Sequence, residues 1–207
     1  LKPNAAFELV SNLKENISVP IHMQTHATTG FSTATNMKAI EAGIDNIDTS
    51  ISSMSMTYGH TATETMVSMF DDTNIFSDID KNLFPELSTH FKKIRKKYEL
   101  YEGSLKGVDA SMLINQVPGG MLSNLESQLR EMDADDKFED VLNEIPRVRQ
   151  DLGFVPLVTP SSQIVGAQAL FNVLDNERYK HLNLETVNLI LGKYGKVPGK
   201  INEFLTD

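Results

Sequence analysis

The chain has 207 residues, 40% apolar and 23% charged, which is the composition of a globular protein long enough to bury a core. It contains no cysteine, which excludes disulfides, thiolate catalysis and cysteine-ligated metal centres and agrees with the cytoplasmic location that we expect. The net charge of -9 argues against a nucleic-acid partner, and no apolar stretch approaches the roughly 20 residues of a membrane-spanning helix.

The first part of the chain alternates between helical and strand patterns. The predicted elements are, in chain order, a helix over 5–14, a strand over Ile21–His26, a helix over 33–42 that stops at Gly43, a strand over Ile44–Ile51 and a helix from about Thr61. This alternation is typical of a parallel sheet with helical crossovers, which is an α/β fold.

The rest of the chain is mostly helical in pattern. Predicted helices cover 82–98, 122–132, 137–150, 165–174 and 184–191. One short strand is conceivable over Phe154–Val158. The basic run from Lys92 to Lys97 falls in the first of these helices, with Phe91, Ile94 and Tyr98 as its apolar side, and we interpret it as a solvated helix face.

Two strands are too few for the fold that this alternation suggests. A (β/α)8 barrel needs eight strands in about 250 residues. The chain also begins on a helix, as though a strand came before Leu1. We therefore expect a fragment, or one chain of a split protein.

The most suggestive polar stretch is Ile21–Gly30, with the sequence IHMQTHATTG. In a strand, alternate residues share a face and lie about 6.6 Å apart, so one metal could be held by Gln24 and His26 but hardly by His22 and His26 together. Spacing thus makes His26 a candidate metal ligand, with the Gln24 oxygen as a weak donor beside it. The alternative is a polar strand end that is hydrogen-bonded in a loop.

A second polar stretch, Thr159-Pro160-Ser161-Ser162, comes just before a predicted helix. Ser161 or Ser162 could cap the helix that starts near Val165. A hydroxyl cluster at a helix start could instead position a polar substrate. The sequence has neither a Gly-x-Ser-x-Gly elbow nor a phosphate-binding glycine loop, so serine hydrolase and nucleotide-binding activities have no support.

Several segments in order resemble one family, the biotin-dependent carboxyltransferases of the oxaloacetate decarboxylase and pyruvate carboxylase kind. The stretch IHMQTHATTG resembles its IH-x-H-x-H-x-T-[ST]-G segment. The resemblance continues through 38–64 (KAIEAGIDNIDTSISSMSMTYGHTATE), 117–128 (VPGGMLSNLESQ), 152–174 (LGFVPLVTPSSQIVGAQALFNVL) and 177–195 (ERYKHLNLETVNLILGKYG). TPSSQIVG with ERYK is most similar to the oxaloacetate decarboxylase alpha subunit, whereas single-chain pyruvate carboxylases usually have Lys at the position of Gln163.

The resemblance implies the C-terminal part of a TIM (β/α)8 barrel over residues 1–80, followed by a mostly helical domain over 81–207. The family holds a metal with two histidines of the segment that contains His26, and with an Asp and a carboxylated Lys that would lie before Leu1. His26 matches the second of these histidines, whereas Gln24 stands in place of the first. Thr159 matches the threonine that passes a proton between biotin and the pyruvate enolate.

The implied activity is transfer of a carboxyl group between oxaloacetate or pyruvate and biotin, through a metal-stabilised enolate. The metal would be zinc, with cobalt or manganese as alternatives. No Ala-Met-Lys-Met type motif occurs, so biotin would be carried on another segment or subunit. Further expected partners are the N-terminal barrel segment, a second copy in a homo-oligomer, and membrane subunits if the parent is a sodium-linked decarboxylase.

Two other functions stay open at this point. A metal-dependent lyase or aldolase of the hydroxymethylglutaryl-CoA lyase type shares the barrel and a similar His-x-His strand, but it lacks the PGG and TPSSQIVG helical region. The third alternative is a non-catalytic fragment that serves only assembly.

Overall fold

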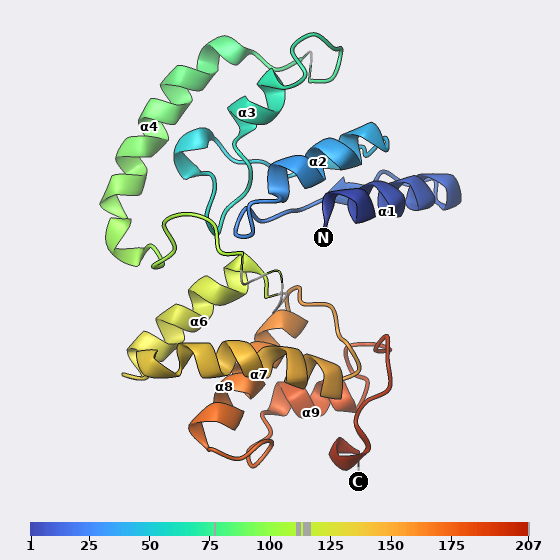
Figure 1. Cartoon of the computed structure of the whole chain (residues 1–207), viewed down its shortest axis with the longest axis vertical. Helices are drawn as coiled ribbons and strands as arrows, with labels where there is room; N and C mark the ends of the chain where they lie inside the picture. Colours follow the sequence, from blue (N-terminus) through green and yellow to red (C-terminus); the bar gives the residue numbers. More distant parts are fainter. Residues whose placement is uncertain (77, 111–112, 114–116, 207) are drawn as a thin grey trace. The chain divides into compact units, whose positions relative to one another are not determined.

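The computed structural model describes residues 1–76, 78–110, 113 and 117–206 (Figure 1). The chain divides into two compact units, Leu1–Ser111 and Met112–Asp207, each with buried residues of its own. Among the described helices, none combines the length and the apolar composition that a bilayer span requires.

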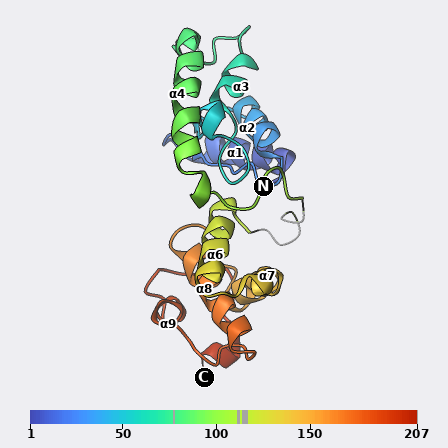
Figure 2. The same cartoon turned by 90° about the vertical axis from the view of Figure 1, so that its left-hand side faces the viewer.

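The first unit is built on a short parallel β-α-β motif. Strand β1 (His22–Met23) pairs in parallel with β2 (Asn46–Ile47), and α2 (Ser32–Glu41) connects them. Helix α1 (Pro3–Asn16) packs beside α2, as both views show (Figures 1 and 2). The predicted α/β class, with parallel strands and a helical crossover, is thus confirmed for this part of the chain.

Both strands are much shorter than the sequence predicts. The ladder pairs two residues of each strand, and its bonds include those from Asn46 N to Ile21 O at 3.1 Å and from Asp48 N to Met23 O at 2.9 Å. Beyond Met23 the backbone turns to another partner, because Ala27 N donates to Gly59 O at 2.8 Å. The predicted strand over 21–26 is therefore wrong in its second half, and its polar residues lie in a loop at the carboxyl end of β1.

Helices α1 and α2 bury small side chains against each other. In α1, Ala6 and Val10 are buried, whereas Leu9 of the same helix is 48% exposed. In α2, Asn36 and Ala39 are buried. The helix ends as expected, because Gly43 adopts a φ of +86°, a backbone conformation that favours glycine.

The first unit continues through short helices and one long helix. Its remaining elements are η1 (Ser52–Met54), α3 (Thr63–Ser68), η2 (Lys81–Leu83), α4 (Phe84–Lys97) and η3 (Glu99–Tyr101). Helix α4 buries none of its residues completely, and its lysines, Lys92, Lys93, Lys96 and Lys97, are exposed, which confirms the solvated basic face. Of its predicted apolar side, Phe91 and Ile94 are half-buried, whereas Tyr98 is 60% exposed.

The second unit is helical in its described part. It contains α6 (Gly119–Glu131), η4 (Asp135–Lys137), α7 (Phe138–Asp151), α8 (Ser161–Leu174), α9 (Leu184–Ile190) and η5 (Glu203–Leu205). Its core side chains come mainly from α6, α7 and α8 and include Leu125, Leu129, Val141, Ile145, Val148, Val165 and Ala169. Each predicted helix is found, although α8 begins four residues before Val165. The conceivable strand over 154–158 is a loop instead, in which Phe154 has a φ of +59°.

A polar network holds the chain after α8 against α7. Arg178 donates from Nε to Glu144 and from Nη2 to Asp151, both at 2.6 Å. Asn172 donates to the same Glu144 oxygen at 2.8 Å, and the Tyr179 hydroxyl donates to Asp151 at 3.0 Å. Both carboxylates are buried, so these bonds compensate for their lost hydration.

Candidate metal and proton-transfer residues

The start of β1 is fixed by a carboxylate from the following strand. Asp45 accepts from the Ile21 backbone N–H at 2.7 Å and from Lys14 Nζ at 2.8 Å. The bond from Lys14 and then the bond from Ile21 hold the pKa of Asp45 below its usual value. The carboxylate is therefore ionised at neutral pH and ties α1 to the strand that leads into the polar loop.

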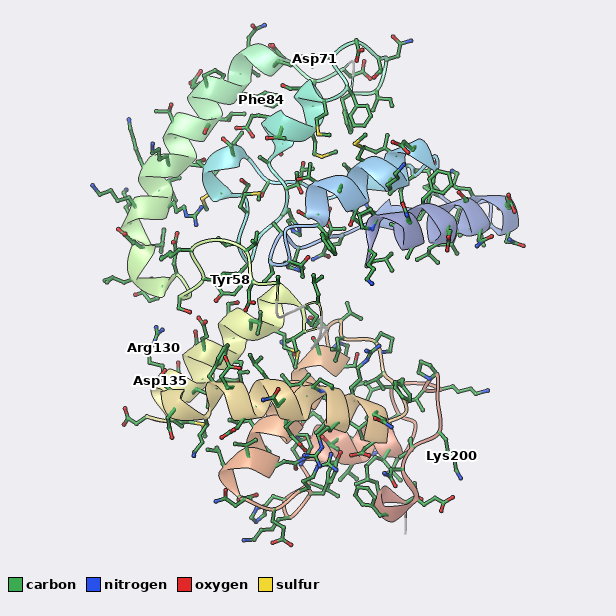
Figure 3. The ribbon with its side chains drawn as sticks, in the orientation of Figure 1. Tyr58, Asp71, Phe84, Arg130, Asp135 and Lys200 are labelled. Carbon is green, nitrogen blue, oxygen red and sulfur yellow. The ribbon has the colours of Figure 1, made fainter. Side chains whose placement is uncertain are left out.

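His26 has a defined tautomer. Its Nδ1 lies 2.5 Å from the carbonyl oxygen of Tyr58. Tyr58, which is labelled in Figure 3, lies in the loop between η1 and α3. Because a carbonyl only accepts, Nδ1 carries the hydrogen and Nε2 keeps a lone pair in the neutral ring. Metal-binding histidines are typically oriented by such a bond to a backbone carbonyl. The ring of His26 is thus prepared to bind a cation through Nε2.

The amide of Gln24 lies next to this nitrogen. Gln24 Nε2 is 3.4 Å from His26 Nε2 and donates to its lone pair, whereas exchanging the amide's oxygen and nitrogen, which have nearly the same shape, would put the oxygen there. Two donors that share a metal at about 2.1 Å each are separated by about 3.0 to 3.4 Å. The two side chains therefore fit as two corners of one coordination shell. Within the described ranges, no group of three or more His, Asp or Glu side chains is placed to hold a metal, so the pair is a partial ligand set.

His22 does not join this pair through a regular strand. Its Nε2 lies 2.7 Å from Asp48 Oδ1 and the side chain is exposed. Since β1 ends at Met23, the expectation that His22, Gln24 and His26 share one strand face is wrong beyond that residue. The closeness of Gln24 and His26 comes from the loop instead.

His60 is a neighbour of this pair that the sequence analysis did not select. Its Nδ1 lies 2.7 Å from the carbonyl oxygen of Thr25, and its ring centroid is 5.2 Å from that of His26. The loop that carries it is held in place by Thr61, whose hydroxyl bonds to Ser32 at 2.7 Å. A usable signal was present in the sequence, because His60 follows the second strand pattern and the carboxyl ends of parallel strands meet at one edge.

Thr159 is exposed, and a cis peptide bond joins it to Pro160, the residue directly before α8. Among the residues that the structure describes, its hydroxyl has no hydrogen-bond partner. The side chain is therefore free to exchange a proton with a bound molecule. The structure describes Thr159 in the second unit and His26 in the first, and each is placed within its own unit.

The predicted serine cap of α8 is wrong. The Ser161 hydroxyl does not accept from a backbone N–H but donates to the carbonyl oxygens of Pro156 at 2.5 Å and Val158 at 2.9 Å. The helix starts at Ser161 rather than near Val165, because the N–H of Ser162 already bonds to Val158 O at 2.9 Å. The backbone N–H groups of Ser162, Gln163 and Ile164 are thus satisfied within the chain.

Comparison with known proteins covers both units. Residues 112–207 match the family described as a conserved carboxylase domain, and residues 1–90 match the family described as HMGL-like. One of the pyruvate carboxylase subunits of Methanocaldococcus jannaschii is 50% identical over 98% of this chain and 36% of its own length. The methylmalonyl-CoA carboxyltransferase 5S subunit from Propionibacterium freudenreichii is 46% identical over 96% of this chain and 39% of its own length. Both units of the chain are thus similar to biotin-dependent carboxylases and carboxyltransferases.

A solved carboxyltransferase structure extends the likeness to the fold. The carboxyl transferase domain of Rhizobium etli pyruvate carboxylase, with pyruvate, is similar with a TM-score of 0.89 and 28% identity, covering 99% of this chain and 36% of that one. The chain thus spans between a third and two fifths of the length of the carboxyltransferases that it matches. The resemblance found in the sequence motifs is confirmed over nearly the whole chain.

Proposed function

We propose that the protein, in its complete form, is an enzyme that transfers a carboxyl group between oxaloacetate or pyruvate and biotin. The observation that carries the proposal is the likeness, over at least 96% of the chain, to the subunits of a pyruvate carboxylase and of a carboxyltransferase. The likeness runs through both units, so it includes the loop of His26 and the loop of Thr159.

The proposed architecture places residues 1–80 in the last βα units of a TIM barrel and residues 81–207 in a helical domain. The parallel pairing of β1 with β2 through α2 supports the first assignment. The helices from α6 to α9 support the second. The remaining barrel strands would be supplied by an N-terminal segment, and the loop of His26 would then lie at the carboxyl ends of the strands, where barrel enzymes have their active sites.

His26, with Gln24 beside it, would hold a divalent metal. The Nε2 lone pair of His26 and the 3.4 Å separation of the two side chains support this assignment. Zinc suits an imidazole nitrogen, with cobalt or manganese as alternatives, and a neutral amide would make binding weaker than a second imidazole would. When bound, the metal acts as a Lewis acid that lowers the cost of negative charge on the substrate's C2 oxygen.

Thr159 would move the proton of the reaction. Loss of the carboxyl group from oxaloacetate leaves an enolate whose terminal carbon needs a proton. The Thr159 hydroxyl donates this proton and takes one back from the nitrogen that receives the carboxyl group. Its exposure and its lack of a partner among the described residues support this role. In the opposite direction, the Thr159 hydroxyl takes a proton from the methyl group of pyruvate and gives one to the biotin nitrogen. That nitrogen releases its carboxyl group to the pyruvate carbon, and pyruvate becomes oxaloacetate.

The proposed partners follow from the same assignment. Biotin would be carried on another segment or subunit, because no biotin-attachment motif occurs in these 207 residues. A homo-oligomer in the cytoplasm, and membrane subunits in the case of a sodium-linked decarboxylase, stay predictions.

One observation favours a second function. Residues 1–90 match the HMGL-like family. A metal-dependent lyase of the hydroxymethylglutaryl-CoA lyase type would give the same match. The match of residues 112–207 to the conserved carboxylase domain favours the carboxyltransferase instead.

Avidin, which captures biotin, separates the candidates. If the complete enzyme is the carboxyltransferase, avidin should abolish its decarboxylation of oxaloacetate. A lyase should stay active in the presence of avidin. A non-catalytic assembly protein would lack both bound metal and decarboxylation.

The role of Thr159 is tested in the complete enzyme. We expect Thr159→Ala to reduce carboxyl exchange between oxaloacetate and biotin about 100-fold or more, because a positioned proton carrier typically contributes this much. Thr159→Ser, which keeps the hydroxyl, is the matched control and should retain most of the exchange. Metal content should be the same in both variants. If Thr159→Ala exchanges carboxyl groups as fast as Thr159→Ser, Thr159 does not carry the proton.

A further inference from the structure

Gln24 leaves the proposed metal site one imidazole short. An amide oxygen is a weaker ligand for zinc or cobalt than an imidazole nitrogen, so a site with Gln24 and His26 would lose affinity unless another nitrogen replaces the missing one. The replacement would have to lie within a few ångström of His26 Nε2 and to carry a free lone pair. His60 is the histidine whose ring contacts that of His26.

His60 and His26 are held in the same way. His26 Nδ1 bonds to the carbonyl of Tyr58, and His60 Nδ1 bonds to the carbonyl of Thr25. Each histidine thus reaches across to the backbone of the loop that carries the other. Because both carbonyls only accept, both rings carry their hydrogen on Nδ1 and keep the Nε2 lone pair. This carbonyl bond at the second nitrogen is the usual orientation of a metal-binding imidazole.

The separation of the two rings also fits one shared cation. Two imidazoles bound through nitrogen at about 2.1 Å, at a tetrahedral angle, place their ring centroids about 5 Å apart. The observed distance is 5.2 Å, with the ring planes inclined by 37°, so the rings are not stacked face to face. A further backbone bond, from Ala27 N to Gly59 O at 2.8 Å, fixes the spacing of the two loops.

We propose that His60 is a ligand of the divalent metal, and supplies through Nε2 the imidazole nitrogen that Gln24 does not provide. The inference rests on the proposed metal site at His26. The cation would then bind one imidazole nitrogen from the loop after β1 and one from the loop after β2. The Gln24 amide would be a weaker ligand beside them.

Co²⁺ titration of the complete enzyme tests the proposal, with the ion's visible absorption as the readout. We expect His60→Ala to weaken Co²⁺ binding at least about 10- to 100-fold and to shift the absorption bands, because one nitrogen is lost. His60→Gln separates ligation from positioning, since its amide can still donate to the Thr25 carbonyl but offers no imidazole nitrogen. It should bind as poorly as His60→Ala. The exposed His90, on α4, provides the control, and His90→Ala should bind Co²⁺ like the unaltered complete enzyme.

Proton NMR of the Co²⁺-loaded, unaltered complete enzyme gives a second readout that needs no variant. Two imidazole Nδ1–H signals shifted by the paramagnetic ion are expected, and one of them should vanish in His60→Gln. A single shifted signal, or wild-type affinity in His60→Gln, would show that His60 only positions the loop and would overturn the inference. Failure of the unaltered complete enzyme to bind Co²⁺ would overturn it too. If His26→Ala binds Co²⁺ like wild type, the proposed metal site itself is wrong, so the two failures are distinguishable.

Discussion

Single residues in the second unit show how closely its segments approach one another. Gly153, which follows α7, has a φ of +79°, and a Cβ there would lie 2.7 Å from Val197 Cγ2 and 2.8 Å from the Gly199 carbonyl oxygen. The Gly199 N–H in turn donates to Gly153 O at 2.8 Å. A side chain at position 153 would therefore collide with backbone that is itself hydrogen-bonded and cannot simply move aside.

We expect Gly153→Ala to lower the free energy of unfolding by about 2 to 4 kcal/mol, which is the sum of a left-handed backbone cost and of overpacking. Gly192→Ala is the matched control. Gly192 has a similar φ of +73° but nothing within 4 Å of its Cβ position, so only about 1 to 2 kcal/mol should be lost. Urea denaturation of both variants measures the difference. Equal losses would mean that the close approach to Gly199 contributes nothing.

Between elements, a polar network links α7 to the segment after α8. Tyr179 donates to Asp151, and its partial burial and then the negative charge of Asp151 raise the pKa of the Tyr179 hydroxyl. A tyrosine whose pKa is raised by folding keeps its proton in the folded state when the unfolded chain has already lost it. Its contribution to stability is therefore complete below about pH 10 and is lost as the pH rises further.

Tyr179→Phe tests this link. At neutral pH the variant should be less stable by about 1 kcal/mol, because one hydrogen bond to a buried carboxylate is lost. Above about pH 10 the gap between wild type and variant should narrow, since the wild type alone loses the tyrosine contribution. Thermal unfolding of both proteins from pH 7 to pH 11 measures the gap. Two curves that stay parallel over this range would contradict the assigned direction of the pKa shift.

On the scale of the whole molecule, charge dominates the behaviour of the chain in solution. The net charge is -9 and the isoelectric point is about 5.0, yet Lys92, Lys93, Lys96 and Lys97 gather on one exposed helix. Large apolar side chains such as Leu100 and Tyr101, which are 90% and 83% exposed, follow the same helix. Near the isoelectric point, copies of the chain no longer repel one another by their net charge, so their exposed apolar side chains can associate.

We therefore expect the 207-residue chain to be least soluble near pH 5 and to stay dispersed at neutral pH. Replacing Lys92 and Lys93 with glutamate should move the minimum to lower pH, because it makes the chain more acidic. Replacing both with arginine keeps the charge and serves as control. Light scattering across pH 4 to 8 measures the minimum, and a minimum that does not move with the glutamate variant would exclude net charge as its cause.

Local patterns of residues determined a large part of this protein. Helical periodicity found α1, α2, α4 and the helices of the second unit, because an amphipathic helix is defined by spacing along its own segment. Gly43 ended α2 as expected, since a left-handed backbone is a property of the residue itself. The motifs around His26 and Thr159 indicated the same families of protein as the comparisons do.

Tertiary structure decided what spacing could not. The length of a strand depends on which backbone lies beside it, and the ladder of β1 with β2 stops after two residues, so Gln24 and His26 became loop residues. The tautomer of His26 depends on Tyr58, which lies 32 positions away in the sequence, and His60 became its neighbour only through the crossed bonds of two loops. Helices are determined by the residues of their own segment, whereas the contacts that build a site join residues far apart in the chain.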